Sequence, residues 1–305
     1  MNQSPTVHRR RLGGELRRLR EAAQRTHREV AAHLDCSQGK ISQIELGRVP
    51  VRTADVRLMA EFYGSSSEQV SELLELAEAS KQRGWWQEHP STARRSGFDT
   101  YLGLETAATA LSVFEPDPLP ELLQTAEYSA TLLRSSREGF TAPEISDRVA
   151  VTSKRQQRLL GTDPLELWAV LDEAALRRRV GGSRLMRGQL EHLVLMSYRR
   201  NVTVQVLPFD VGAHPFLGER VTVFSFRENT DQQVVHAGGP PNSRFLDKSG
   251  ETEPYLTAFE QVCSMALPPK ESTMLISRIA DEQPCRPLRR RSARPEVIGG
   301  PAPGK

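Results

Sequence analysis

The stretch from Thr26 to Gly47 contains two short helical segments in close succession, each with its own start signal. Glu29 follows Thr26 by three residues, an arrangement in which each side chain bonds the other residue's backbone amide and starts a helix. Ser37 is a second N-cap residue that opens the segment SQGKISQIE, and Gly47 is a glycine suited to end it. A tight connection at 35–37 separates the two segments. The spacing predicts two helices of about eight residues joined by about three turn residues.

Apolar periodicity predicts further helices around this pair. Leu12, Leu16, Leu19 and Ala23 share one helical face, and the opposite face is mostly arginine. Thr53 is a suitable cap for a later helix. The five predicted helices are 12–24, 26–34, 37–46, 53–63 and 67–82. Together they predict a compact all-α domain.

The pattern changes after Trp86, where residues 87–100 are polar and interrupted by Pro and Gly. Helical patterns resume at Leu102–Phe114, Leu119–Ser136 and Pro143–Leu160. Strand-like runs follow at Leu165–Leu171, Val202–Leu207, Val221–Arg227 and Gln233–His236. The remaining helices are predicted at 172–180, 183–197, 252–265 and 270–282. Because the first two of these separate the first two strands, those strands are expected to pair in parallel, in an α+β domain with a small mixed sheet.

Charge is distributed unevenly over a chain of this organisation. The predicted parts are a helical domain at 8–83, a connection at 84–100, an α+β domain at 101–282 and a disordered basic tail at 283–305. Residues 1–57 carry 12 Lys and Arg against 6 Asp and Glu, whereas residues 58–281 carry 23 against 30. A basic head on an acidic body suits a head that binds nucleic acid, although small domains also vary by a few charges.

Several classes of protein do not fit the sequence. No stretch approaches the ~20 apolar residues that span a bilayer, and the first residues lack the apolar run of a secretory signal. The three cysteines, Cys36, Cys263 and Cys285, form no CxxC pair and no disulfide framework, so a reducing cytoplasm is expected. No Walker, GxSxG, HExxH or dinucleotide-binding motif occurs. We therefore expect no membrane span, metal site or cofactor, and no catalytic residues.

The helix at 37–46 is the candidate for reading DNA. Two closely joined helices can place the second one in the major groove while the first crosses the backbone. With Ile41 and Ile44 turned inward, polar side chains are left outside, and Gln and Lys can bond adenine and guanine edges. The candidate base contacts are Ser37, Gln38, Lys40, Ser42 and Gln43. The candidate phosphate contacts are Arg17, Thr26, His27, Arg28, Arg48 and Arg52. A solvated helix face and ordinary surface arginines are the alternative interpretation.

The pattern T-x-x-E-V-A-x-x-L-x-x-S-Q-x-K-I-S-x-I-E-x-G, from Thr26 to Gly47, resembles the helix-turn-helix of the Xre/phage-repressor class, which has a lambda-repressor-like fold. The resemblance implies that Gln38, Gly39 and Gln43 occupy base-reading positions. It also places His27 where the family often has a phosphate-contacting Gln. The sequence departs from the family at Asp35, which replaces the usual turn glycine. Gly39 has no side chain, so specificity has to depend on its neighbours.

The resemblance extends over about residues 12–281. The segments that carry it are RGWW at 83–86, YLGLE at 101–105, LLQTAEY at 122–128, LWAVLDEAALRR at 167–178 and NVTVQVLPF at 201–209. They resemble a large actinobacterial group in which an Xre-type head precedes a conserved domain of unknown function. That group includes WhiJ-like developmental regulators and Scr-type antitoxin-like regulators, often paired with small partner proteins. The resemblance implies transcriptional regulation and assigns no chemistry to the second domain.

Other residues have two interpretations each. Trp85 and Trp86 could stack on nucleic acid, but two adjacent indoles more often pack the head against the body. Asp172 and Glu173 could be paired catalytic carboxylates, and they equally suit the cap and first turn of a helix. His192, His214 and His236 have no close-spaced ligand partner, and of these His214 is the candidate for touching a ligand.

These observations predict a cytoplasmic, sequence-specific regulator that is nucleoid-associated when bound to double-stranded DNA. A homodimer is expected, because two recognition helices about 34 Å apart fit a palindromic site. The second domain is expected to bind itself, a small partner protein or an effector. The alternative is an antitoxin-like interaction protein that sequesters a partner and autoregulates its operon. An enzyme in residues 165–240 is a further alternative with little support.

Overall fold

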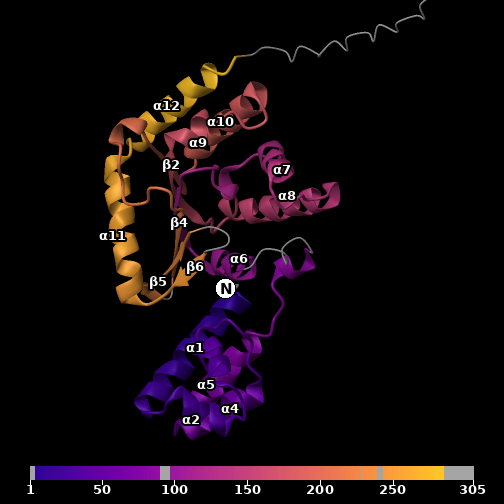
Figure 1. Cartoon of the computed structure of the whole chain (residues 1–305), viewed down its shortest axis with the longest axis vertical. Coiled ribbons are helices and arrows are strands. Elements are labelled where there is room, and N and C mark those ends of the chain that lie inside the picture. Colours follow the sequence, from indigo (N-terminus) through magenta and orange to yellow (C-terminus); the bar gives the residue numbers. More distant parts are fainter. Residues whose placement is uncertain (1–3, 90–96, 228, 239–242, 285–305) are drawn as a thin grey trace, which may run out of the picture.

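The computed structural model describes residues 4–89, 97–227, 229–238 and 243–284, and it has a helical N-terminal domain and a larger α+β C-terminal domain (Figure 1). This is the two-part architecture that the sequence predicts. The predicted basic tail from residue 285 onward lies outside the described residues, as do residues 90–96 of the connection.

The five predicted helices of the N-terminal domain are present and share one apolar core. They are α1(Pro5–Ala22), α2(His27–His33), α3(Gln38–Glu45), α4(Thr53–Phe62) and α5(Ser67–Ala79). The prediction that the first helix begins at Leu12 was wrong. Ser4 caps it, because its side chain accepts a hydrogen bond from the amide of Thr6 at 3.2 Å. The predicted cap at Thr53 was also wrong, since Arg52 is the N-cap and makes no side-chain cap bond.

The C-terminal domain is built on a six-stranded mixed sheet of order β3-β2-β1-β4-β5-β6. Its strands are β1(Ala110–Glu115), β2(Glu166–Asp172), β3(Val202–Leu207), β4(Val221–Phe226), β5(Asn229–Ala237) and β6(Arg244–Leu246). The first three strands pair in parallel, as predicted for β2 and β3, and the other pairings are antiparallel. The parallel half lies at the centre and one end of the sheet, where helices connect successive strands.

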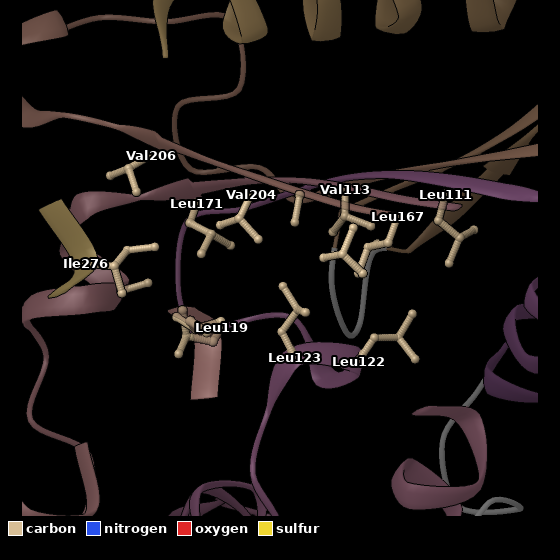
Figure 2. Packing of buried hydrophobic residues seen from close by; sticks show 14 of the residues in the cluster. Leu111, Val113, Leu119, Leu122, Leu123, Leu167, Leu171, Val204, Val206 and Ile276 are labelled. Carbon is tan, nitrogen blue, oxygen red and sulfur yellow. The ribbon is translucent and has the colours of Figure 1, made fainter. Parts of the chain in front are cut away.

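Helices cover both faces of this sheet. The helical elements are η1(Trp85–Glu88), α6(Phe98–Ala107), η3(Glu121–Leu123), α7(Ala126–Ser135), α8(Ala142–Gln156), η4(Gln157–Leu159), α9(Glu173–Arg177), α10(Ser183–Ser197), η5(Phe209–Val211), α11(Ser249–Met265) and α12(Pro269–Asp281). In Figure 1, α11 runs along one side of the sheet, and α6, α7 and α8 lie on the other. Val113 and Phe114 of β1 show the alternation, since Val113 packs on the α10 and α12 side and Phe114 packs on the α11 side. Figure 2 shows apolar side chains of β1, β2 and β3 above Leu119, Leu122 and Leu123.

Two predicted helices of this domain were wrong in part. Residues 102–114 were predicted to form one helix, but the helix ends at Ala107 and strand β1 begins at Ala110. Only two residues separate the end of α6 from the start of β1, and no Gly or Pro marks the boundary between them. The helix predicted over 119–136 is a short 3-10 turn followed by α7, which begins after the cap Thr125. The short edge strand β6 was not predicted.

The two domains meet along the first turns of α1, whose N-terminal end lies beside α6 (Figure 1). Gly103 of α6 contacts Thr6 so closely that a Cβ atom on the glycine would overlap the threonine side chain. Arg10 of α1 forms an ion pair with Asp247, in the loop before α11. Trp86 is buried against Leu102 of α6 and Val151 of α8, so it packs on the C-terminal domain, and its predicted packing against the head stays a prediction. α1 therefore packs in the core of the N-terminal domain and also contacts the surface of the C-terminal domain.

Candidate nucleic-acid interface

Local capping bonds hold the α2–α3 pair in place. The amide of Glu29 donates to Thr26 Oγ1 at 3.3 Å, and the amide of Thr26 donates to Glu29 Oε2 at 2.7 Å. At the start of α3, Ser37 Oγ accepts from the amide of Lys40 at 3.2 Å. Asp35 adopts a left-handed conformation with φ of 48°, which Asp tolerates better than most residues. Asp35 thus adopts the left-handed conformation that a glycine usually provides in this turn.

A buried ion pair fixes α3 against α1 and α2. Glu45, only 6% exposed, accepts from Arg20 Nε at 2.7 Å and from the Arg20 terminal nitrogen at 3.0 Å. His27 Nε2 lies 3.0 Å from the same carboxylate. The hydrogen bonds to Glu45 raise the pKa of Arg20, and burial opposes this shift. The Glu45–Arg20 ion pair therefore holds the C-terminal end of α3 against α1.

Gly13 allows α1 to approach this end of α3. A Cβ atom on Gly13 would lie 2.5 Å from the carbonyl oxygen of Ile44 and 2.6 Å from that of Glu45. Gly47, with φ of 62°, ends the helix against Arg10. The orientation of α3 is therefore set by backbone contact with α1 as well as by the ion pair.

The predicted base-contacting residues are exposed or half-buried. Ile41 and Ile44 are buried, as predicted. Ser37, Gln38, Gly39 and Lys40 are exposed, while Ser42 and Gln43 are half-buried. The exposed polar atoms therefore gather at the N-terminal half of α3, where free backbone amides favour an anionic group.

The predicted phosphate-contacting residues differ in what they contact. Arg28 and Arg48 are exposed and form no ion pair with any described residue. Arg17 pairs with Glu21 one turn along α1, its Nε lying 2.8 Å from Oε1. Arg52 holds Asp55 through two hydrogen bonds of 2.9 and 3.1 Å, and it remains mostly exposed.

Two carboxylates close to α3 were missed by the sequence analysis. Asp55 follows Arg52 by three residues, so helical spacing could have identified that pair. Lys40 Nζ lies 3.9 Å from the same Asp55 carboxylate, which brings α3 and α4 together. The bond between Glu45 and Arg20 joins residues 25 positions apart in the sequence, and no local pattern signals it.

The other candidate residues of the sequence have structural partners. Asp172 caps α9 by accepting from the amide of Ala174 at 2.7 Å, as the capping interpretation predicts. Glu173 accepts from Arg177 at 2.6 Å and from the amide of Phe209 at 3.1 Å. The ring of His214 packs edge-on against Phe114.

The described residues contain no group of three or more His, Cys, Asp or Glu that could hold a metal ion. None of their helices combines the length and the apolar character needed to cross a membrane.

Comparison with known proteins gives two matches to family models. Residues 11–73 match a helix-turn-helix domain, and this region contains α2 and α3. Residues 98–278 match a domain of unknown function, DUF5753. No curated protein and no solved structure matches the chain. Because the second match covers more than half of the sequence, the protein belongs to the DUF5753 family, and it carries a helix-turn-helix domain at its N-terminal side.

Proposed function

We propose that this protein is a sequence-specific DNA-binding transcriptional regulator that reads the major groove with α3. The main support is the arrangement of α3 itself. Its apolar residues are buried, its N-terminal half presents exposed polar side chains, and its far end is fixed by Glu45. A rigid helix with one polar edge is what insertion into a groove requires.

Two kinds of contact contribute different parts of the binding. Arg28 and Arg48, which pair with no carboxylate among the described residues, would neutralise phosphates and release counterions, so affinity would fall with salt. Gln38 and Gln43 would bond base edges and provide the sequence preference. Thr26, His27, Arg17 and Arg52 would position the backbone from the rim of the interface.

Selection of duplexes from a random library by the full chain, followed by fluorescence anisotropy at several salt concentrations, tests this function. We expect Arg48→Ala to weaken binding to the selected and a scrambled duplex alike, and to lower the salt slope by about 1. Gln43→Ala should instead cost roughly 1–3 kcal/mol of discrimination at one base pair. Arg227→Ala, an exposed arginine of the C-terminal domain, is the matched control. No preferred duplex, or an equal loss on both duplexes for Gln43→Ala, would contradict the proposal.

We further propose that the C-terminal domain brings two copies of the chain together. Leu195, Tyr198 and Met274 are 66%, 76% and 64% exposed on or beside the neighbouring helices α10 and α12. Exposed apolar side chains of this size are typical of protein contacts. Sedimentation velocity should detect a dimer that Leu195→Ser with Met274→Ser converts to a monomer. A wild-type monomer, both free and on DNA, would exclude the homodimer.

The same exposed apolar residues support the alternative that this domain sequesters a small partner protein, as an antitoxin-like regulator would. In that case the wild-type chain is a monomer alone and forms a defined complex when co-expressed with the product of a neighbouring gene. The narrower resemblance to WhiJ-like regulators, the cytoplasmic and nucleoid-associated location and the absence of enzymatic activity remain part of the same proposal.

A further inference from the structure

The C-terminal domain contains a cavity between the sheet and helices α7 and α8. Its volume is about 240 Å³, whereas roughly 10–15 Å³ on the same measure is enough for one water molecule. A smaller cavity of about 60 Å³ adjoins it under α6. The two cavities share Phe98, Glu115, Glu121 and Arg220 in their walls, so they lie side by side, and together they are called the cleft.

Charges of both signs line this cleft, and Arg155 in its wall is also bonded to the buried Glu105. The charged side chains are Arg148, Arg155 and Arg220 together with Glu115, Glu121 and Glu138. Arg220 and Glu115 lie 3.4 Å apart and are both mostly buried. A ligand of net charge would leave an uncompensated charge in this part-buried space, whereas a zwitterion would not. The wall therefore favours a ligand that carries one group of each sign.

The rest of the wall has an apolar part beside α7 and α8 and also includes the polar residues Gln124, Ser129, Ser136 and Thr152. Leu132 and Leu133 of α7 lie opposite Val151 of α8, and Phe140 lies between the two helices with the guanidinium of Arg148 stacked 4.0 Å above its ring. Such a wall suits an aliphatic or aromatic side chain. We propose that the cleft binds a small zwitterion with an apolar side chain, of the amino-acid class, and that the bound ligand changes the affinity of the head for DNA.

In this site Arg220 binds the ligand carboxylate, and Glu115 and Glu121 bind its ammonium group. Arg220 and Glu115 then each bond to the ligand in place of one another, and no charge is left unpaired. The apolar side chain of the ligand lies toward α7 and Phe140. All of these groups lie on the α6 side of the sheet.

Direct packing connects the cleft with the recognition helix. Phe98 at the start of α6 lines both cavities, and Gly103 on the same helix contacts Thr6 of α1 without space for a Cβ atom. Further along α1, Gly13 lies against the carbonyl groups that end α3. A ligand that shifts α6 therefore moves a helix that sets the position of α3. This part of the inference rests on the DNA binding proposed above.

Titration calorimetry of the full chain with L-leucine tests the ligand class. N-acetyl-L-leucine lacks the ammonium group and L-leucinamide lacks the carboxylate. Each should bind at least about tenfold more weakly than leucine, because one charged hydrogen-bonding partner is lost. Equal binding of either analogue, or no saturable binding of leucine at up to about 10 mM, would overturn the zwitterion site.

Variants locate the site. Arg220→Met should weaken leucine binding at least about tenfold, and Phe140→Ala, which leaves every charged group in place, should weaken it severalfold. Arg227→Met, an exposed arginine paired with Asp163 outside the cleft, should bind leucine within about twofold of wild type. Tryptophan fluorescence checks that each variant is folded. Undiminished binding by folded Arg220→Met and Phe140→Ala would place the ligand elsewhere and overturn the proposal.

The regulatory part is tested on the selected duplex. Saturating leucine should change the dissociation constant for DNA by at least about fivefold, and DNA should change the affinity for leucine by the same factor. An unchanged DNA affinity with leucine bound would refute the coupling and leave the ligand site standing. Failure to bind any duplex would refute the proposed function, while the calorimetric result, obtained without DNA, would be unaffected.

Discussion

Each domain contains a buried arginine held by carboxylates, and the two differ in what surrounds them. In the N-terminal domain, Arg20 and Glu45 lie at the edge of a core that is otherwise apolar. In the C-terminal domain, Arg155 is 3% exposed and donates to both oxygens of Glu105 at 2.7 Å, and it also pairs with Glu121 beside the cleft. Burial disfavours the charge of Arg155, but the two carboxylates outweigh it and raise its pKa.

The difference shows that similar ion pairs have different consequences. The pair in the N-terminal domain orients one helix and leaves its outer edge free. The pair in the C-terminal domain joins α6, α8 and η3, and it supplies part of the wall of a cavity. A buried pair gives little net stability, but removal of one partner leaves the other charge unpaired at high cost. The two pairs can therefore be compared by removing one partner from each.

The largest effect is expected for Arg155→Met. It leaves the Glu105 carboxylate buried without a counter-charge and should lower the free energy of unfolding by roughly 3–5 kcal/mol. Trp85, Trp86 and Trp168 all contact or belong to the C-terminal domain, so tryptophan fluorescence during urea unfolding reports this loss. Arg187→Met, at an exposed pair with Glu191, should change stability by less than about 0.5 kcal/mol. Similar stability for both variants would show that the buried pair is not needed.

Glu45→Gln should have a smaller effect and in the other domain. Arg20 keeps its bond to the carbonyl of Arg25 at 2.9 Å and its contact with Glu21 at 3.5 Å, so the loss should be roughly 1.5–3 kcal/mol. Circular dichroism reports the helices of both domains and should detect the loss, whereas the tryptophan signal, which reports the C-terminal domain, should be little changed. Glu78→Gln, at the exposed pair with Lys81, is the control. A loss equal to that of Arg155→Met would remove the distinction between the two pairs.

Gly13→Ala tests whether backbone contact also orients α3. The added methyl group would meet the end of α3 and should destabilise the N-terminal domain by roughly 1–3 kcal/mol, with weaker DNA binding. The neighbouring Gly14 has open space around it, so Gly14→Ala should stabilise α1 by about 0.5–1 kcal/mol. Thermal melts followed by circular dichroism compare the two. Equal melting temperatures would mean that the contact at Gly13 is not constraining.

The smallest effect is expected at alkaline pH. Burial raises the pKa of Tyr128 to about 12, whereas an unfolded tyrosine titrates near 10. Its contribution to stability is complete below pH ~10 and is lost as the pH rises toward 12. Between pH 9 and 11 the free energy of unfolding of wild type should therefore fall by up to about 1.4 kcal/mol more than that of Tyr128→Phe. Tryptophan fluorescence during urea unfolding measures both values. The exposed Tyr198→Phe should follow wild type, and identical pH profiles for all three proteins would contradict the burial of this hydroxyl.

Sequence reasoning succeeded best where a structure depends on neighbouring residues. The caps at Thr26 and Ser37 and the stop at Gly47 act over one turn of helix, so their spacing alone identified α2 and α3. Strand β1 could not be identified in this way, because it is short and follows α6 after two residues with no Gly or Pro to mark the boundary.

In the candidate interface, the features that depend on neighbouring residues were also predictable from the sequence. Exposure of Gln38 and Lys40 follows from the burial of Ile41 and Ile44, and this is a matter of helical period. The bond from Arg20 to Glu45 and the close approach at Gly13 were not predictable, since each joins residues more than 20 positions apart. The DNA-contact roles themselves remain a prediction.

By itself, the sequence determined the helical head, its turn and the polar edge of its third helix, because capping bonds and helical periodicity are short-range. Only the tertiary structure decided how α1 joins the two domains and where the mixed charges of the cleft meet. Glu115 and Arg220 are about 100 residues apart in the sequence, and they meet in one wall because β1 and β4 pair antiparallel, which places the end of β1 beside the start of β4.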